Sequence, residues 1–153
     1  MFSLCLEEKP VTEIVVGNIT YTFSVDIHKS LLVPVEHEKE IRDLLLNSSY
    51  IEIVFNGTGK DNPYFASVGF NIASKLSIYR NQIGKPIEIK GVEIRNASFA
   101  NTTILLLGPT TGARNCKVYL KNSHIIVVEG RTYPELVMAG DRLMLLLLKD
   151  YMR

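Results

Sequence analysis

The stretch YIEIVFNGTGKDNPYFASVGFNIASKLSIY, from Tyr50 to Tyr79, decides the fold. It opens with an apolar, β-rich run that predicts a strand over residues 50–55. Asn62 and Pro63 then form the pair typical of a helix cap followed by a first-turn proline. Apolar residues recur at helical spacing beyond this pair, so a helix is expected over about residues 63–82. A strand followed by a long helix is the beginning of an α/β crossover.

Three further β-rich segments follow downstream. The segment KPIEIKGVEIRN (85–96) predicts a long strand, bulged or turned at Gly91. The segment TTILLLG (102–108) is apolar throughout, which is typical of a strand buried inside a sheet. The segments CKVYLK and HIIVVEG flank Asn122 and Ser123 and predict a β-hairpin.

Two short β-rich runs and a helix are expected upstream. VTEIVV and ITYTFSVDI are separated by Gly17 and Asn18, and they form either a hairpin or two short strands. The segment PVEHEKEIRDLLLN begins with Pro34 and carries glutamates where the helix dipole favours carboxylates. We expect a helix over about residues 35–47.

The last segment predicts a helix that is apolar on most of its sides. Thr132 and Glu135 form a capping box, and Pro134 stands in the first turn. The run LMLLLL adds apolar surface around the whole circumference, so the helix must be buried on most sides. The interior of a monomer and a dimer interface satisfy this requirement equally well.

From Ile19 to Gly108 the expected order is strand, helix, strand, helix, strand, strand. Two strand–helix–strand crossovers place the helices on one face of a mixed sheet. The sequence therefore predicts an α/β two-layer sandwich of βαβαββ order, extended by a C-terminal hairpin and helix. At 153 residues, residues 1–153 are expected to form a single domain.

The segment FASVGFNIASKLSIYRNQIGKPIEIKGVEIRN, followed by TTILLL, resembles the archaeal Alba chromatin proteins. In those proteins a long helix ends in an Arg-Asn-like turn before an IEIK strand and a final apolar strand. The resemblance covers about residues 19–108, and residues 115–153 form an extension foreign to that family. It implies a nucleic-acid-binding protein, although the family's basic segments are reduced here to Lys29 and Lys60.

Net charge is +1, but the charges are unevenly spread. Residues 1–55 carry −5, residues 56–121 carry +6, and the remainder is neutral. A basic middle segment can form a face that binds anions, or a surface that pairs with an acidic part of a neighbour. The residues expected to contact a DNA or RNA backbone are Lys60, Lys75, Arg80, Lys85 and Arg95.

The loop Gly57-Thr58-Gly59-Lys60 is similar to a phosphate-binding loop but lacks its essential residues. The Walker A pattern places glycine where Val54 stands and serine or threonine where Asp61 stands. We interpret the loop as a glycine-rich connection to the helix. Backbone N–H groups at the helix start, with Lys60 nearby, keep a phosphate contact open as the alternative.

The remaining chemistry-bearing residues form no catalytic or metal-binding pattern. The three histidines lie on different elements, and Cys5 and Cys116 form neither a disulfide framework nor a metal site. The chain begins without a basic region, and its longest apolar run is too short to cross a bilayer. We expect a cytoplasmic, non-enzymatic protein without a cofactor and without a membrane partner.

Two functions compete on this sequence. The first is sequence-nonspecific binding of DNA or RNA through the basic middle segment. The second is a homo-oligomeric protein–protein assembly module, with a homodimer as the expected state. An enzyme at the Gly57–Lys60 loop is a distant third, because it requires a pocket with convergent polar groups there.

Overall fold

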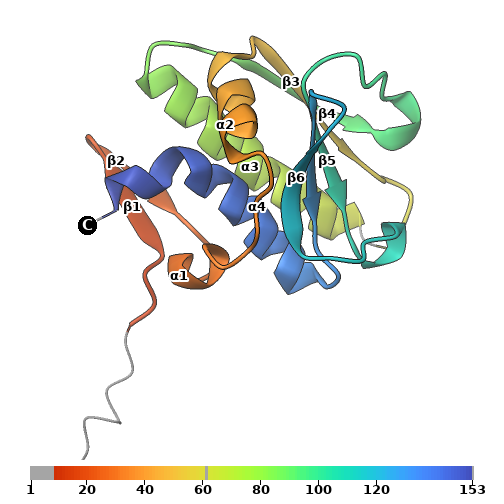
Figure 1. Cartoon of the computed structure of the whole chain (residues 1–153), viewed down its shortest axis with the longest axis horizontal. Coiled ribbons are helices and arrows are strands. Elements are labelled where there is room, and N and C mark those ends of the chain that lie inside the picture. Colours follow the sequence, from red (N-terminus) through yellow and green to blue (C-terminus); the bar gives the residue numbers. More distant parts are fainter. Residues whose placement is uncertain (1–8, 61, 153) are drawn as a thin grey trace, which may run out of the picture.

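The computed structural model describes residues 9–60 and 62–152 and contains a five-stranded sheet (Figure 1). The strands stand in the order β4-β3-β5-β7-β6. The first four are parallel to their neighbours, and β6 is antiparallel to β7. The strand bounds are β3 Tyr50–Phe55, β4 Glu88–Glu93, β5 Thr103–Leu107, β6 Lys117–Lys121 and β7 Ile125–Glu129.

Two long helices lie side by side on one face of this sheet (Figure 1). They are α3 (Asn62–Gln82) and α4 (Tyr133–Leu148). Helix α3 lies directly on the sheet at Gly69, where a methyl group would be in van der Waals contact with Ile53 in β3, at 3.4 Å. Gly140 lets α4 approach α3 closely, since a methyl group there would lie 3.0 Å from Val68. The predicted α/β two-layer sandwich is confirmed.

The expected βαβαββ order along the chain is present, but the N-terminal strands do not join this sheet, which corrects the expectation of two crossovers within it. Strands β1 (Glu13–Val16) and β2 (Ile19–Thr22) pair only with each other among the described residues, as a hairpin around Gly17. Its buried side chains belong to the same core as the helices. Tyr21, for example, donates a hydrogen bond to Gln82 at the end of α3. The hairpin therefore packs against the helix layer, and among the described residues β3-α3-β4 is the one strand–helix–strand crossover within the sheet.

The segment before the second helix also differs from expectation. After the single turn α1 (Ile27–Ser30), helix α2 spans Glu38–Asn47, not residues 35–47. Pro34 and Glu36 are held extended because their main chains bond to Val118 in β6, at 3.0 and 2.9 Å. This pairing with a distant strand overrides the local helix signal of Pro34.

Helix α4 is buried inside the monomer. Residues 143–148 are each no more than 2% exposed, because the helix contacts the sheet, α1, α2 and α3. Thr132 caps it by accepting a hydrogen bond from the Glu135 N–H. Of the two expected ways to bury this helix, the interior of the monomer suffices.

The predicted hairpin around Asn122 and Ser123 is confirmed, whereas the strand predicted over residues 85–96 is shorter and passes through Gly91 without a bulge or turn. Asn122 and Ser123 both have positive φ, 54° and 64°, which is the backbone of a tight turn that matches the twist of a hairpin. The long predicted strand of residues 85–96 ends at Glu93, where a 3-10 turn (Ile94–Asn96) follows. Further 3-10 turns span Pro109–Thr111 and Lys149–Tyr151.

Candidate functional site

Arg80 is buried and hydrogen-bonded to main-chain carbonyls. The residue is only 3% exposed. The guanidinium donates to the carbonyl oxygens of Leu45 (3.0 Å), Ser48 (2.7 Å) and Lys85 (2.7 Å). A phosphate contact would require these bonds to break, so Arg80 is best explained as the residue that ties the end of α3 to the end of α2 and to the segment before β4.

Lys75 lies in the shallow groove between α3 and α4. Its Nζ is 5.1 Å from the centroid of the Phe23 ring, which is a cation–π contact. Burial lowers the pKa of Lys75, and the nearby carboxylate of Asp141 opposes this shift. Burial also raises the pKa of Asp141 to about 6, since the residue is 6% exposed. Lys75 therefore balances a buried acid and packs on an aromatic ring.

Lys60 and Arg95 follow the carboxyl ends of β3 and β4, and both are exposed. Arg95 forms an ion pair with Glu93, at 3.1 Å. Lys85 precedes β4 and bonds to Asn47 at 3.3 Å. Because β3 and β4 are parallel, Lys85 lies at the opposite end of the sheet from Lys60 and Arg95. The structure brings Lys60 and Arg95 to one end and does not gather the five basic residues on one face.

The Gly57–Lys60 loop is stabilised by local contacts. Asn56 Oδ1 accepts hydrogen bonds from the N–H and the hydroxyl of Thr58, at 3.1 and 2.9 Å. The side chain of Glu93 packs against Gly57, where a methyl group would lie 3.2 Å from its carboxyl carbon. This carboxylate is already paired with Arg95, and loop residues 57–60 line neither the groove between α3 and α4 nor the groove between α3 and β4. The interpretation as a structural connection is therefore the better supported one.

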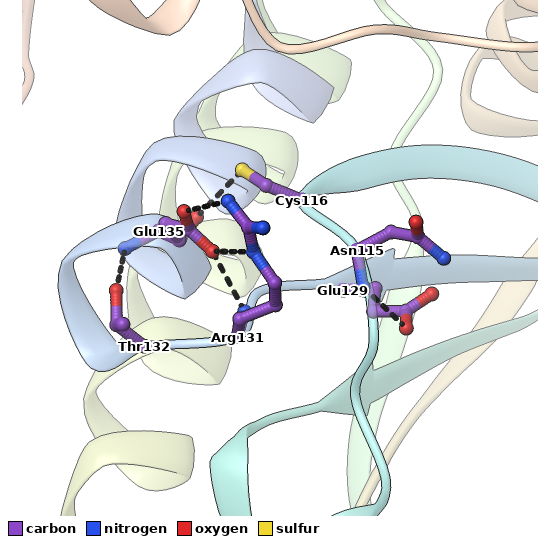
Figure 2. Close-up of polar contacts among 6 residues, drawn as sticks. All are labelled: Asn115, Cys116, Glu129, Arg131, Thr132 and Glu135. Carbon is purple, nitrogen blue, oxygen red and sulfur yellow. Dashed lines mark hydrogen bonds and ion pairs between the residues drawn. The ribbon is translucent and has the colours of Figure 1, made fainter.

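A cluster of polar groups surrounds Cys116 at the start of α4 (Figure 2). Arg131 donates to both carboxylate oxygens of Glu135, at 3.1 and 2.8 Å, and its own N–H donates to the same carboxylate. Cys116 donates to the Glu135 carbonyl at 3.7 Å. Burial, aided by the negative charge of Glu135, raises the pKa of the thiol. A reactive thiol needs the opposite shift, so this cluster fastens α4 to β6 and does not activate a nucleophile.

The buried acid of the same cluster is also satisfied by neighbouring groups. Glu129, 4% exposed, accepts the backbone N–H groups of Arg114 (2.7 Å) and Asn115 (3.2 Å). These bonds hold the loop before β6 against the end of β7. Among the described residues, no group of three or more His, Cys, Asp or Glu side chains is arranged to hold a metal ion.

Strand β4 forms one edge of the sheet. Within the described part of the chain it pairs with β3 alone. Glu88 donates its N–H to Ser49 at 3.1 Å, so its backbone points toward β3. Successive residues of a strand point their backbone groups to opposite sides, which turns the N–H and C=O groups of Ile87, Ile89 and Gly91 outward. An exposed strand edge of this kind is a template for pairing with another strand.

An apolar groove of about 280 Å³ lies beside this edge, between β4 and α3. Ile89 and Gly91 form its floor at the edge strand, and Phe70 and Ala73 line it from α3. Phe70 is 72% exposed. An aromatic ring with this exposure, next to an apolar groove and an open strand edge, is the combination typical of a protein interaction site.

The sequence-based predictions did not include this site, although the sequence contains signals for it. Phe70 lies off the buried stripe that Phe65, Ile72 and Leu76 define, so an aromatic residue was left on the outer side of the helix. The same stripe passes through Lys75 and Arg80, four residues before Tyr79 and four after Leu76. Helical spacing alone could thus have indicated that these two basic residues are partly or fully buried.

Comparisons with family models, with curated proteins and with solved structures found no match. No helix in the described ranges combines the length and the apolar character needed to cross a membrane.

Proposed function

We propose that the protein is a non-enzymatic assembly module that associates through the edge of its sheet at β4. The single observation that carries the proposal is the open β4 edge beside the apolar groove that contains Phe70. A partner strand placed at this edge gains main-chain hydrogen bonds and covers the groove at the same time.

The alternative surface for assembly is weaker. The sequence of helix α4 is apolar enough to suggest a dimer interface. In the structure, however, the rest of the monomer covers this helix. Phe70 on α3 is 72% exposed, more than Val15 and Tyr151 beside the groove at the N-terminal hairpin, and it lies next to an open edge of the main sheet. Covering an aromatic side chain removes roughly 150–250 Å² from water, which is a substantial part of the energy of a small interface.

The test is the oligomeric state measured by sedimentation over about a hundredfold range of concentration. Phe70→Ser is expected to weaken self-association by about tenfold or more, because it removes the apolar contact but leaves the fold intact. Leu32→Ser is the matched control, since Leu32 is 81% exposed and lines neither groove beside α3. A protein that stays monomeric throughout, or an equal effect of the two changes, contradicts the proposal.

Nonspecific binding of a DNA or RNA backbone is the second candidate. It is favoured by the charge of +6 on residues 56–121 and by the exposure of Lys60, Lys85 and Arg95. Arg80 and Lys75 are excluded from this candidate contact set because of their burial. A gel-shift titration at low and moderate salt tests it: binding must weaken steeply as salt rises, and Lys60→Ser must weaken it further.

A further inference from the structure

Residues 85–93 have complementary charges when two copies of the segment are aligned antiparallel. The segment reads Lys85-Pro-Ile-Glu-Ile-Lys-Gly-Val-Glu93. When the two copies are centred on Ile89, Glu88 of one lies opposite Lys90 of the other, and Lys85 lies opposite Glu93. We propose that the occupant of the β4 edge is a second copy of this chain, paired antiparallel about a two-fold axis through Ile89. This inference rests on the proposed assembly function and adds the partner and the register.

The direction of the backbone groups agrees with this register. Ile89 faces the partner's Ile89, and Ile87 faces the partner's Gly91, and all of these residues point their backbone groups outward from β3. They are therefore the hydrogen-bonded pairs of the new ladder, which gains about six main-chain hydrogen bonds. Pro86 lacks an N–H, but its backbone nitrogen points away from the partner, so it costs this ladder nothing.

Neighbouring registers lose the charge complementarity. An axis through Lys90 places Lys90 against the partner's Lys90, at a position where opposing side chains are closest. An axis through Gly91 leaves Lys90 opposite Val92 and Glu93 opposite Ile89. If the axis passed between two residues, each residue whose N–H and C=O point away from β3 would oppose one whose N–H and C=O point toward β3. No ladder of hydrogen bonds could form. The register about Ile89 alone satisfies both the charges and the backbone.

The groove gains a cover from the same pairing. Ile89 and Gly91 lie on the helix-facing side of β4, because both line the groove together with Phe70. The partner's Ile87 enters above Gly91, where the absence of a side chain leaves room. Phe70 of each copy then lies next to the two-fold axis, over the Ile89 pair. Opposite charges between Glu88 and Lys90 lie on the other side of the sheet.

Cysteine substitution at the axis tests the register directly. In a background with Cys5→Ser and Cys116→Ser, Ile89→Cys places two thiols on opposing strands about 5.5 Å apart between Cα atoms, within reach of a disulfide. Val92→Cys is the matched control: its nearest copy lies six residues further along the ladder, roughly 20 Å away. Mild oxidation followed by non-reducing electrophoresis should cross-link the first and not the second. Equal cross-linking of the two variants overturns the proposal.

Charge reversal tests the pairing in an independent way. Glu88→Lys and Lys90→Glu should each weaken the homodimer by about tenfold, since each sets like charges opposite one another twice. A mixture of the two single variants should recover the affinity of the unchanged protein, because all four charges then oppose their complements. Circular dichroism on each variant confirms that the fold is retained.

The outcomes separate this inference from the proposed function. If the unchanged protein associates but the mixture does not recover affinity and Ile89→Cys does not cross-link, the register is wrong and assembly stands. If the unchanged protein is monomeric at every concentration, both are wrong. Recovery in the mixture together with cross-linking at residue 89 supports both.

Discussion

The two edge strands of the sheet, β4 and β6, are protected in different ways. At the β6 edge the chain adds its own segment: Val118 donates its N–H to Pro34 at 3.0 Å and accepts the Glu36 N–H at 2.9 Å. Lys117 also pairs with Glu36, at 3.7 Å. At the β4 edge the outward backbone groups face no other described strand. One edge is closed within the monomer, and the other stays open among the described strands.

Each edge is anchored by a buried arginine. Arg142 donates to the carbonyl of Val33 at 3.1 Å and pairs with Glu38 at 3.5 Å, which holds the segment that covers β6. Arg80 donates to the carbonyls of Leu45 and Ser48 at the end of α2 and to that of Lys85 before β4. A buried arginine thus positions the segment beside each edge strand, but a further segment of the chain covers only β6. An open edge that is positioned this firmly is consistent with a role in assembly.

The largest expected effect is that of proline at the covered edge. Val118→Pro should lower the free energy of unfolding by about 3 kcal/mol or more, because it removes the N–H bond to Pro34 and forces the proline ring into a buried site. The matched change Ile89→Pro should cost the monomer less, about 1–2 kcal/mol, because the Ile89 N–H points outward and only the packing of its partly buried side chain is lost. Urea unfolding of dilute protein measures both. Equal losses would mean that the two edges are equally buried.

The buried arginines come next. Arg80→Met should destabilise the protein by about 2–3 kcal/mol, because three carbonyl groups lose their donor. Arg142→Met should cost less, about 1–2 kcal/mol, because one carbonyl loses its donor, Glu38 keeps its ion pair with Lys149, and the new side chain keeps the packing. Thermal or urea unfolding provides the comparison. A larger loss for Arg142 would show that the cover over β6 is the more important of the two anchors.

A smaller effect is expected from pH at the covered edge. The hydrogen bond from Lys149, with Arg142 nearby, holds the pKa of Glu38 below its ordinary value of 4.5. The carboxylate therefore stabilises the fold above pH 4.5, and this contribution is lost as the pH falls through the lowered pKa. The side chain is 43% exposed, so the contribution is about 0.5 kcal/mol or less. Glu38→Gln should flatten the acid side of the stability curve by this amount, and an unchanged curve contradicts the assignment.

The smallest effect leaves stability unchanged and appears only in hydrogen exchange. In dilute protein the amides of Ile89 and Gly91 should exchange quickly, whereas the amide of Val118 should be protected. In concentrated protein the first two should become protected as the β4 edges pair. Mass spectrometry or NMR at two concentrations reads out the difference. Protection of Ile89 in dilute protein would mean that the β4 edge is closed within the monomer.

Elements with local signals were predicted well. Strand β3, helix α3 and the hairpin around Asn122 and Ser123 follow from residue spacing, capping and turn chemistry, which act over a few positions. The start of α2 and the place of β2 were predicted wrongly, because each depends on pairing with a distant part of the chain. For the candidate site, the charge pattern of residues 85–93 was present in the sequence, but its meaning required the knowledge that β4 is an edge.

The sequence by itself determined the class of fold, the long elements and the uneven distribution of charge. Tertiary structure decided which apolar and charged residues remain available. It buried α4 and Arg80, covered β6 with residues 34–36 and left Phe70 beside β4. The physical reason is range: helical periodicity and turn preferences act between neighbours, whereas burial and strand order depend on contacts between residues far apart in the chain.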